Sequence, residues 1–152
     1  MKTKKIVCIL FILFIIIICF NSLKKQTSLN QNTDPKTTIE NSFKFENDHD
    51  VNKLKNCYTS NLVDAVCKKD SVDNIESTKL LNLNLVTDET YYQNYINTKD
   101  NLKRDDIAIY NVNYYVKFKG LRAEPIDSGE DETYYYVIKE KDSTWKIDSI
   151  GY

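Results

Sequence analysis

The lone histidine of this sequence stands among acidic residues, where a metal site is the first chemistry to test. His49 lies in the stretch NDHD, between Asp48 and Asp50. Imidazole and carboxylate groups are good zinc ligands, but adjacent residues rarely converge on one ion without further ligands from elsewhere in the chain. We therefore interpret the stretch as a solvated turn between two helices and predict no metal site.

Other catalytic patterns are sparse. With one histidine in 152 residues, no glycine-rich phosphate loop and no nucleophile elbow, the sequence gives little support to Ser-His-Asp catalysis or nucleotide hydrolysis. We predict a protein that is not an enzyme, without catalytic residues or a cofactor.

Tyrosines on predicted strands are the remaining candidates, because the chain has 11 of them. In DIAIYNVNYYVKFK, residues 106–119, apolar side chains from Ala108 to Phe118 alternate with polar ones and predict a half-buried strand. TYYYVIKEKDSTWKIDSIGY, residues 133–152, predicts a hairpin that turns near Asp142 and Ser143. Buried tyrosines pack their rings and need a partner for each hydroxyl. We expect the interior and any ligand-binding surface to be lined by Tyr110, Tyr114, Tyr134, Tyr136 and Trp145.

The elements before these strands read as short helices. Asp34 and Pro35 suit the start of a helix that carries Ile39 and Phe43 on one face. Asp50 and then Ser60 can cap two further helices, the first with Leu54, Cys57 and Tyr58, the second with Val63, Val66 and Cys67. Residues 68–78 are polar and predict a loop. The alternation of Leu81, Leu83 and Leu85 with asparagines predicts a strand, and residues 90–103 favour a short helix.

Residues 6–20, IVCILFILFIIIICF, form an apolar run behind three lysines. At ~1.5 Å per residue it spans ~22 Å, which is marginal for a membrane helix and long for a signal-peptide core. Around Cys19–Leu23, where signal peptidase needs small side chains, the candidates are Phe, Asn and Leu with one Ser, and Ile18 precedes Cys19 where a lipobox has a small residue. We predict a retained single-pass anchor in the cell membrane, with cleavage and lipidation as the alternatives. The lysines should hold the N-terminus in the cytoplasm and place the domain outside.

The domain organisation follows from this run. We predict an anchor or signal segment over residues 1–23, a flexible linker over 24–34 and one extracytoplasmic domain over 35–152. After Lys25 the chain has 16 basic and 22 acidic residues, a net charge of −6, and only two arginines. This composition predicts no nucleic-acid partner.

Helices followed by a run of antiparallel strands predict an α+β domain. Short helices across the concave face of a curved antiparallel sheet are the cone-like architecture of the nuclear transport factor 2-like and cystatin-like folds. The last 33 residues, GLRAEPIDSGEDETYYYVIKEKDSTWKIDSIGY, resemble the C-terminal signature of domain-of-unknown-function family 4829, found on exported proteins of low-GC Gram-positive bacteria. The matching positions are Gly120, Pro125, Ser128, Gly129, Trp145, Ile147, Asp148 and Gly151.

The resemblance covers most of the chain after Lys36 and implies a cone-like α+β domain behind an export signal, with no assigned activity. Enzymes of the cone superfamily often use an Asp–His pair or a pocket tyrosine, roles open to Asp148 and the inward tyrosines. A place in the core or the pocket lining is the favoured interpretation of the tyrosines. Some members are lipoproteins, but Ile18 before Cys19 does not fit the lipobox of such proteins.

Cys57 and Cys67 fall in the exported part of the chain, where an oxidising exterior permits a disulfide. On one straight helix they would lie ~15 Å apart, too far to bond, whereas a break near Ser60 would let them meet. Two buried thiols are the default and a Cys57–Cys67 disulfide is the alternative.

The leading functional hypothesis is a membrane-tethered, extracytoplasmic binding or accessory domain, which takes a small ligand or docks a cell-surface protein. The alternative is an assembly component of a cell-surface, conjugation or secretion machine, and the third is a small-molecule enzyme that uses the cone pocket.

Overall fold

The computed structural model describes residues 34–151, which fall within the second of two units divided between residues 31 and 32. The predicted anchor over residues 1–23 and the linker, apart from Asp34, lie outside the described residues. Within residues 34–151, no helix is both long and apolar enough to cross a membrane.

The first helix, α2 (Pro35–Asn47), begins where the sequence predicts. Asp34 accepts hydrogen bonds from the backbone nitrogen of Thr37 at 2.8 Å and from the Thr37 hydroxyl at 2.6 Å. An aspartate at this position satisfies backbone donors that the helix leaves without partners, and proline fits the first turn because it lacks one. Ile39 and Phe43 are buried, so the predicted apolar face is confirmed.

Four short helices follow: α3 (Val51–Leu54), the 3-10 helix η1 (Lys55–Cys57), α4 (Ser60–Val66) and α5 (Lys69–Asn74). Asp50 caps α3 through the backbone nitrogen of Lys53 at 3.1 Å, as predicted. Ser60 is the first residue of α4 and Thr59 takes the cap position. The predicted loop over residues 68–78 is wrong, since α5 and the start of the first strand occupy it. The sequence does not reveal α5 because this helix buries only Val72 and Asn74, and one apolar residue gives no helical periodicity.

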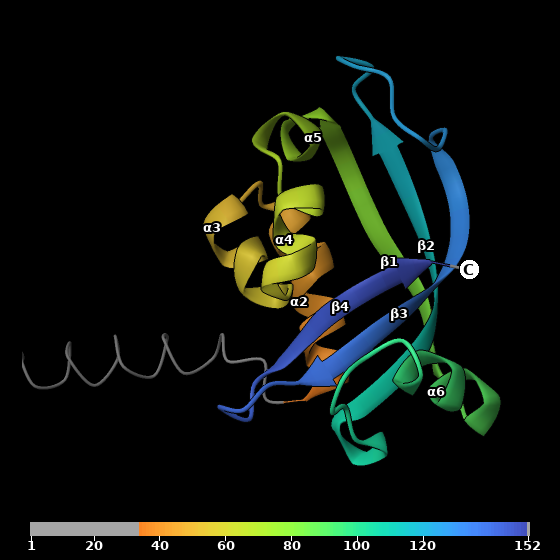
Figure 1. Ribbon diagram of the computed structural model, residues 1–152. Helices are drawn as coiled ribbons and strands as arrows, with labels where there is room; N and C mark the ends of the chain where they lie inside the picture. Colours follow the sequence, from red (N-terminus) through yellow and green to blue (C-terminus); the bar gives the residue numbers. More distant parts are fainter. Residues whose placement is uncertain (1–33, 152) are drawn as a thin grey trace, which may run out of the picture. The chain divides into compact units, whose positions relative to one another are not determined.

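Four strands form one antiparallel sheet in the order β1-β2-β3-β4: β1 (Ile75–Leu85), β2 (Ile107–Phe118), β3 (Gly129–Lys139) and β4 (Trp145–Gly151). The sheet curves, and helices α2 to α5 lie on one side of it, whereas α6 (Glu89–Ile96) lies against the other (Figure 1). The short η2 (Arg104–Asp106) precedes β2. This arrangement confirms the predicted α+β class, with helices packed on a four-stranded antiparallel sheet.

The predicted strand around Leu81–Leu85 exists, but its burial is not the simple alternation expected. The pairing of β1 with β2 shifts between Leu80 and Asn82, so a bulge changes which face each residue takes. Leu80 and Leu83 pack against the core, while Leu81 and Leu85 are exposed.

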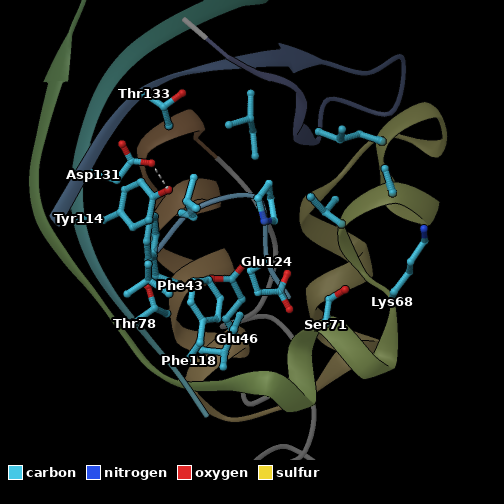
Figure 2. Close-up of a pocket in the computed structure, with 18 of the residues that line it drawn as sticks. Phe43, Glu46, Lys68, Ser71, Thr78, Tyr114, Phe118, Glu124, Asp131 and Thr133 are labelled. Atoms are coloured by element: carbon cyan, nitrogen blue, oxygen red, sulfur yellow. Dashed lines mark hydrogen bonds between the residues drawn. The ribbon is translucent and has the colours of Figure 1, made fainter. Parts of the chain in front are cut away.

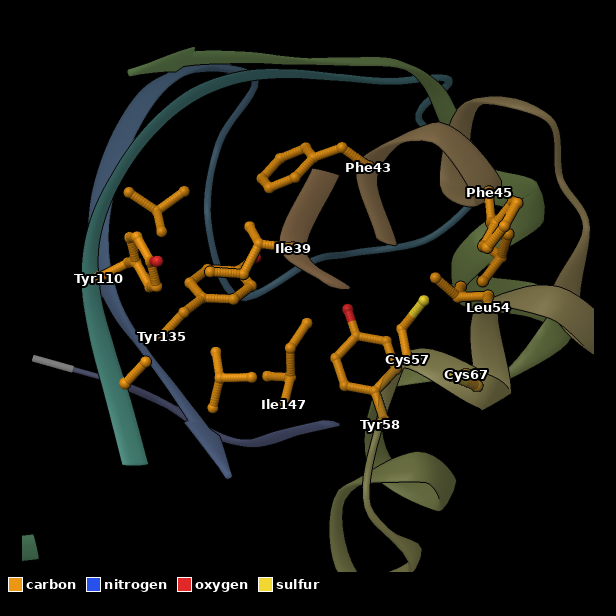
Figure 3. Close-up of a cluster of buried hydrophobic side chains, with 14 residues drawn as sticks. Ile39, Phe43, Phe45, Leu54, Cys57, Tyr58, Cys67, Tyr110, Tyr135 and Ile147 are labelled. Carbon is orange, nitrogen blue, oxygen red and sulfur yellow. The ribbon is translucent and has the colours of Figure 1, made fainter. Parts of the chain in front are cut away.

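The main core lies between the helices and the inner face of the sheet (Figure 3). Ile39 of α2, Leu54 of α3, Val112 of β2 and Ile147 of β4 are fully buried there. Burial of such side chains contributes ~1.5–3 kcal/mol each. A second, smaller cluster forms on the outer face, where Tyr92 and Tyr95 of α6 cover the start of β2, residues 107–109.

The last strand contains a bulge at Asp148. Val137 of β3 pairs with Ile147, and Tyr136 pairs with Ser149, so Asp148 is the extra residue between the two pairs. Because of this insertion, Ile147 and Ile150 both face the core side although they are three residues apart. Tyr58 also forms a parallel bridge with Ile147, which ties the helical layer to the edge of β4.

Candidate functional site

Tyr110 and Tyr114 lie on the inner face of β2, but they reach different environments. Tyr110 is buried in the closed part of the core, where desolvation raises its pKa. Tyr114, four residues on, lies at the wall of an open pocket. Of these two predicted residues, the structure therefore brings only Tyr114 to a cavity.

Tyr134 and Tyr136 lie on the outer face of β3, so their predicted place in the interior is wrong. The Tyr136 and Tyr95 ring centroids are 4.5 Å apart, and the hydroxyls of Tyr134 and Tyr91 are 3.2 Å apart. Tyr135 takes the inward position instead. Three consecutive tyrosines offer an aromatic residue to both faces, and α6 covers the face that the sequence interpretation left to solvent.

Trp145 is the remaining predicted lining residue. It starts β4 and is half-buried against the main core, outside the pocket lining. Its backbone oxygen accepts a hydrogen bond from the Thr38 hydroxyl at 3.1 Å, which ties β4 to α2. The inner-face position predicted for Trp145 agrees with this packing, but Trp145 does not line the cavity.

The cavity is a pocket of about 550 Å³ between the inner face of the sheet and helices α4 and α5 (Figure 2). A pocket of this size is in the range that accommodates small molecules. One wall comes from the strands, with Thr78 of β1, Val116 and Phe118 of β2 and Thr133 of β3. Figure 2 shows Lys68 and Ser71 on the opposite, helical wall. The loop that joins β2 to β3 completes the lining with Arg122, Glu124, Pro125 and Ile126.

An aromatic group forms part of the pocket wall. The ring centroids of Phe43 and Tyr114 are 5.5 Å apart, and those of Phe43 and Tyr135 are 6.1 Å apart, both tilted. Pairs at these separations are favourable beyond their area of contact. The Tyr114 hydroxyl donates to a carboxylate oxygen of Asp131 at 3.0 Å. This bond holds one carboxylate at the aromatic wall, as the dashed line in Figure 2 shows.

Asn74, buried at the end of α5, organises the β2–β3 loop. Its side-chain oxygen accepts from the backbone nitrogen of Leu121 at 2.7 Å, and its amide nitrogen donates to Glu124 at 2.8 Å. Glu124 also pairs with the Arg122 guanidinium at 3.1 Å. Gly120 begins the loop with a φ of 74°, a conformation that glycine adopts without strain. The loop between β2 and β3 thus forms one rim of the pocket.

Glu46, on the last turn of α2, adds a carboxylate whose surroundings differ from those of Asp131 and Glu124. It is half-buried in the pocket lining, and within residues 34–151 no hydrogen bond or ion pair reaches its carboxylate. Desolvation raises the pKa of Glu46 to about 7. Removal from water penalises the charged form of a carboxyl group unless a partner compensates.

Asp148 lies elsewhere. Its carboxylate accepts hydrogen bonds from Thr59 at 2.9 Å and from the Tyr95 hydroxyl, and it pairs with the Lys99 ammonium at 2.6 Å. Burial by itself would raise the pKa of Asp148, but the bonds from Lys99, Tyr95 and Thr59 hold it below its ordinary value. Asp148 therefore joins β4 to α6 and to the start of α4, and it does not face the pocket.

His49 occupies the exposed turn after α2 with a φ of 52°. Its Nε2 lies 3.4 Å from the ammonium of Lys119. Asp50 caps α3 and Asp48 takes the C-cap position of α2, so the interpretation as a solvated interhelical turn is confirmed. Within the described part of the chain, no group of three or more histidine, cysteine or acidic side chains is arranged to hold a metal ion.

Cys57 and Cys67 are both buried thiols, which agrees with the default expectation and not with the disulfide alternative. The Cys57 sulfur lies 3.9 Å from the backbone oxygen of Lys53. Desolvation raises the pKa of Cys67 to about 11, so its reactive thiolate form is suppressed.

Sequence reasoning missed Glu46, Asp131 and Tyr135 as lining residues. Glu46 carries one signal, because it lies three residues after the buried Phe43 on a helix and must share its face in part. Asp131 alternates with Thr133 and Tyr135 along β3. Once Tyr135 is known to face inward, the alternation places Asp131 on the same side.

These features define a class of protein: an α+β domain with a small-molecule-sized pocket between short helices and the inner face of an antiparallel sheet. Residues 36–151 match the family described as Domain of unknown function (DUF4829), and the chain belongs to this family. No curated protein and no solved structure matches the chain.

Proposed function

We propose that this protein is a membrane-tethered, extracytoplasmic binding domain whose pocket takes a small molecule without chemically changing it. The open pocket of about 550 Å³ carries the proposal, since its walls combine aromatic rings with a few convergent polar groups. This combination is typical of ligand sites. The apolar run at residues 6–20 supports the tether, and its flanking lysines support an outward-facing domain. The helices across one face of a curved sheet support a cone-like, nuclear transport factor 2-like architecture.

Binding rather than catalysis is supported by the chemistry of the lining. Within the described residues, neither histidine nor cysteine lines the pocket. Acid–base catalysis needs a titratable group within hydrogen-bond reach of the proton it moves, commonly with a second group to orient it. Glu46 has a raised pKa but lacks such an orienting hydrogen bond within residues 34–151.

A blocking variant tests the proposal. Ala65 lies on the pocket side of α4, and Ala65→Trp should fill the cavity. Asn61→Trp, exposed on the same helix and outside the pocket lining, is the matched control. Native mass spectrometry of the full-length chain released from its own membranes should show a bound small molecule in the wild type and the control. The blocked variant should lose it. Equal bound mass in both variants, or none in the wild type, contradicts pocket binding.

The assembly alternative has one specific observation in its favour. Leu81 and Leu85 are 42% and 54% exposed on β1, an edge strand of the sheet. Exposed apolar residues on an edge strand favour docking of another chain. A Leu81→Lys, Leu85→Lys double variant should then abolish crosslinks to a neighbouring surface protein while Ala65→Trp keeps them. The reverse result supports the pocket.

A further inference from the structure

The charges around the pocket are not evenly distributed. Three carboxylates line it, from Glu46, Glu124 and Asp131, against two cations, Lys68 and Arg122. Both cations belong to exposed residues at the rim, and Arg122 is already engaged by Glu124 and by the Ser71 hydroxyl at 3.1 Å. Asp131 accepts a hydrogen bond from Tyr114. The carboxylate without a partner within the described residues is therefore that of Glu46, which lines the pocket together with the aromatic rings.

The walls near Glu46 have the composition of a site for an apolar cation. Phe43, Tyr114 and Tyr135 present aromatic rings within one group, and ring faces attract positive charge. Val116 and Phe118 add an apolar surface that favours a hydrophobic body over a small hydrated ion.

Other titratable groups that face Glu46 do not supply the missing charge. They are Tyr58 from the segment before α4, Tyr135 from β3 and Cys67 at the end of α4. Burial raises the pKa of all three, so each is neutral near pH 7. A neutral hydroxyl or thiol does not balance a carboxylate, whereas a bound ammonium group does.

We propose that the pocket binds an organic cation, an amine with an apolar body, whose ammonium group pairs with the Glu46 carboxylate while its body packs on Phe43, Tyr114 and Tyr135. The inference rests on the proposed pocket-binding function and specifies its ligand class. Desolvation without a partner keeps the pKa of Glu46 near 7 in the empty pocket, and a bound cation would lower it. Binding is then coupled to loss of a proton from Glu46 and weakens as the pH falls below 7.

Three probes of one shape test the charge preference: 4-phenylbutylamine, 4-phenylbutanol and 4-phenylbutyrate. The readout is the NMR signal of Tyr114 and Tyr135 in the full-length, ¹³C-tyrosine-labelled chain in lipid nanodiscs. At pH 8 the amine should bind at least about tenfold more tightly than the alcohol, since an ion pair shielded from water adds that much or more. At pH 5.5 this preference should disappear.

Two variants assign the preference to one residue. Glu46→Gln keeps the shape and removes the charge, so it should lower the affinity for the amine about tenfold and leave the alcohol unchanged. Glu130→Gln, exposed on β3 outside the pocket lining, should change neither affinity. A preference for the amine that survives in Glu46→Gln overturns the role of Glu46.

The outcomes separate this inference from the proposed function. If the alcohol or the butyrate binds the wild type as tightly as the amine, the cation proposal is wrong and pocket binding stands. If none of the three probes shifts Tyr114 or Tyr135 at millimolar concentration, pocket binding of such molecules fails as well.

Discussion

Glu46 and Asp148 are two carboxylates that the same domain takes out of bulk water, with opposite results. Asp148, whose side chain is 3% exposed, has three donors around it, and its pKa lies below the ordinary value. Glu46 is less buried as a residue but lacks a compensating partner within residues 34–151, and its pKa rises to about 7. The comparison shows that desolvation raises the pKa of a carboxyl group unless hydrogen-bond and ion-pair partners offset it.

The two groups therefore have different roles. Asp148 fills a bulge in β4 and joins three elements, so its charge is part of the folded structure. Glu46 carries a desolvation cost that no partner in the described residues offsets, and its proposed role in ligand binding rests on this.

The largest expected effect is the loss of the Asp148 carboxylate. Asp148→Ala leaves the Lys99 ammonium and the hydroxyls of Thr59 and Tyr95 without their acceptor, and should lower the free energy of unfolding by about 3–5 kcal/mol at pH 7. Urea denaturation followed by circular dichroism measures it. The pKa of Asp148 is lower in the folded state, so its contribution is present above pH ~4 and disappears in acid. A loss below about 1 kcal/mol at pH 7 would remove the contrast with Glu46.

Lys99→Met sharpens the same test. It removes the cation and keeps the two hydroxyl donors, so the pKa of Asp148 should rise toward its ordinary value. The expected cost is about 1–3 kcal/mol, since hydrogen bonds to charged groups are worth that much. Unchanged acid sensitivity in Lys99→Met would show that the hydroxyls alone hold the charge.

Trp145→Ala tests the packing of β4 separately from the charge of Asp148, which lies in the bulge of the same strand. The indole is half-buried against the main core, so its removal should cost about 2–4 kcal/mol, toward the lower part of the range for large aromatic truncations. The cost should not vary between pH 4 and 8, in contrast to that of Asp148→Ala. A thermal melt within a few degrees of the wild type would place Trp145 on the surface and contradict its inner-face position.

Glu46→Gln should raise the free energy of unfolding, whereas the preceding variants lower it. A rise of the folded-state pKa from 4.5 to about 7 means that the charged form destabilises the fold by at most about 3 kcal/mol above pH 7. The variant should therefore be more stable than the wild type at pH 8, and nearly equally stable at pH 4, where the carboxyl is mostly protonated in both the folded and the unfolded state. Urea denaturation at pH 4 and 8 measures the difference. A variant less stable at pH 8 would reveal an undetected partner for Glu46.

The smallest expected effect is that of His49→Gln. The residue is exposed in a turn and lies outside the pocket lining, so stability should change by about 0.5 kcal/mol or less. Amine binding should also stay the same, in contrast to the loss expected for Glu46→Gln. If His49→Gln abolishes binding while changes at Tyr114 preserve it, the site lies at the helical turn instead of the pocket.

Local signals in the sequence predict much of the fold. Asp34 followed by Pro35 is enough to start α2, because cap chemistry acts within four residues. The alternation along β2 predicts its inner face from Ala108 to Tyr114, since side chains of a strand alternate strictly. Alternation fails in β1 and β4, where bulges insert a residue that no pattern of apolar positions announces.

The sequence by itself determined the α+β class, the capped helices and the inward face of β2, because each depends on residues close together in the chain. Only the tertiary structure decided which of Tyr134, Tyr135 and Tyr136 faces inward, since the docking of α6 on the outer face removes the difference between the two faces. It also decided the state of Glu46. That carboxyl lies in a pocket bordered by a loop more than 70 residues further along the chain, and desolvation depends on what surrounds a group in space.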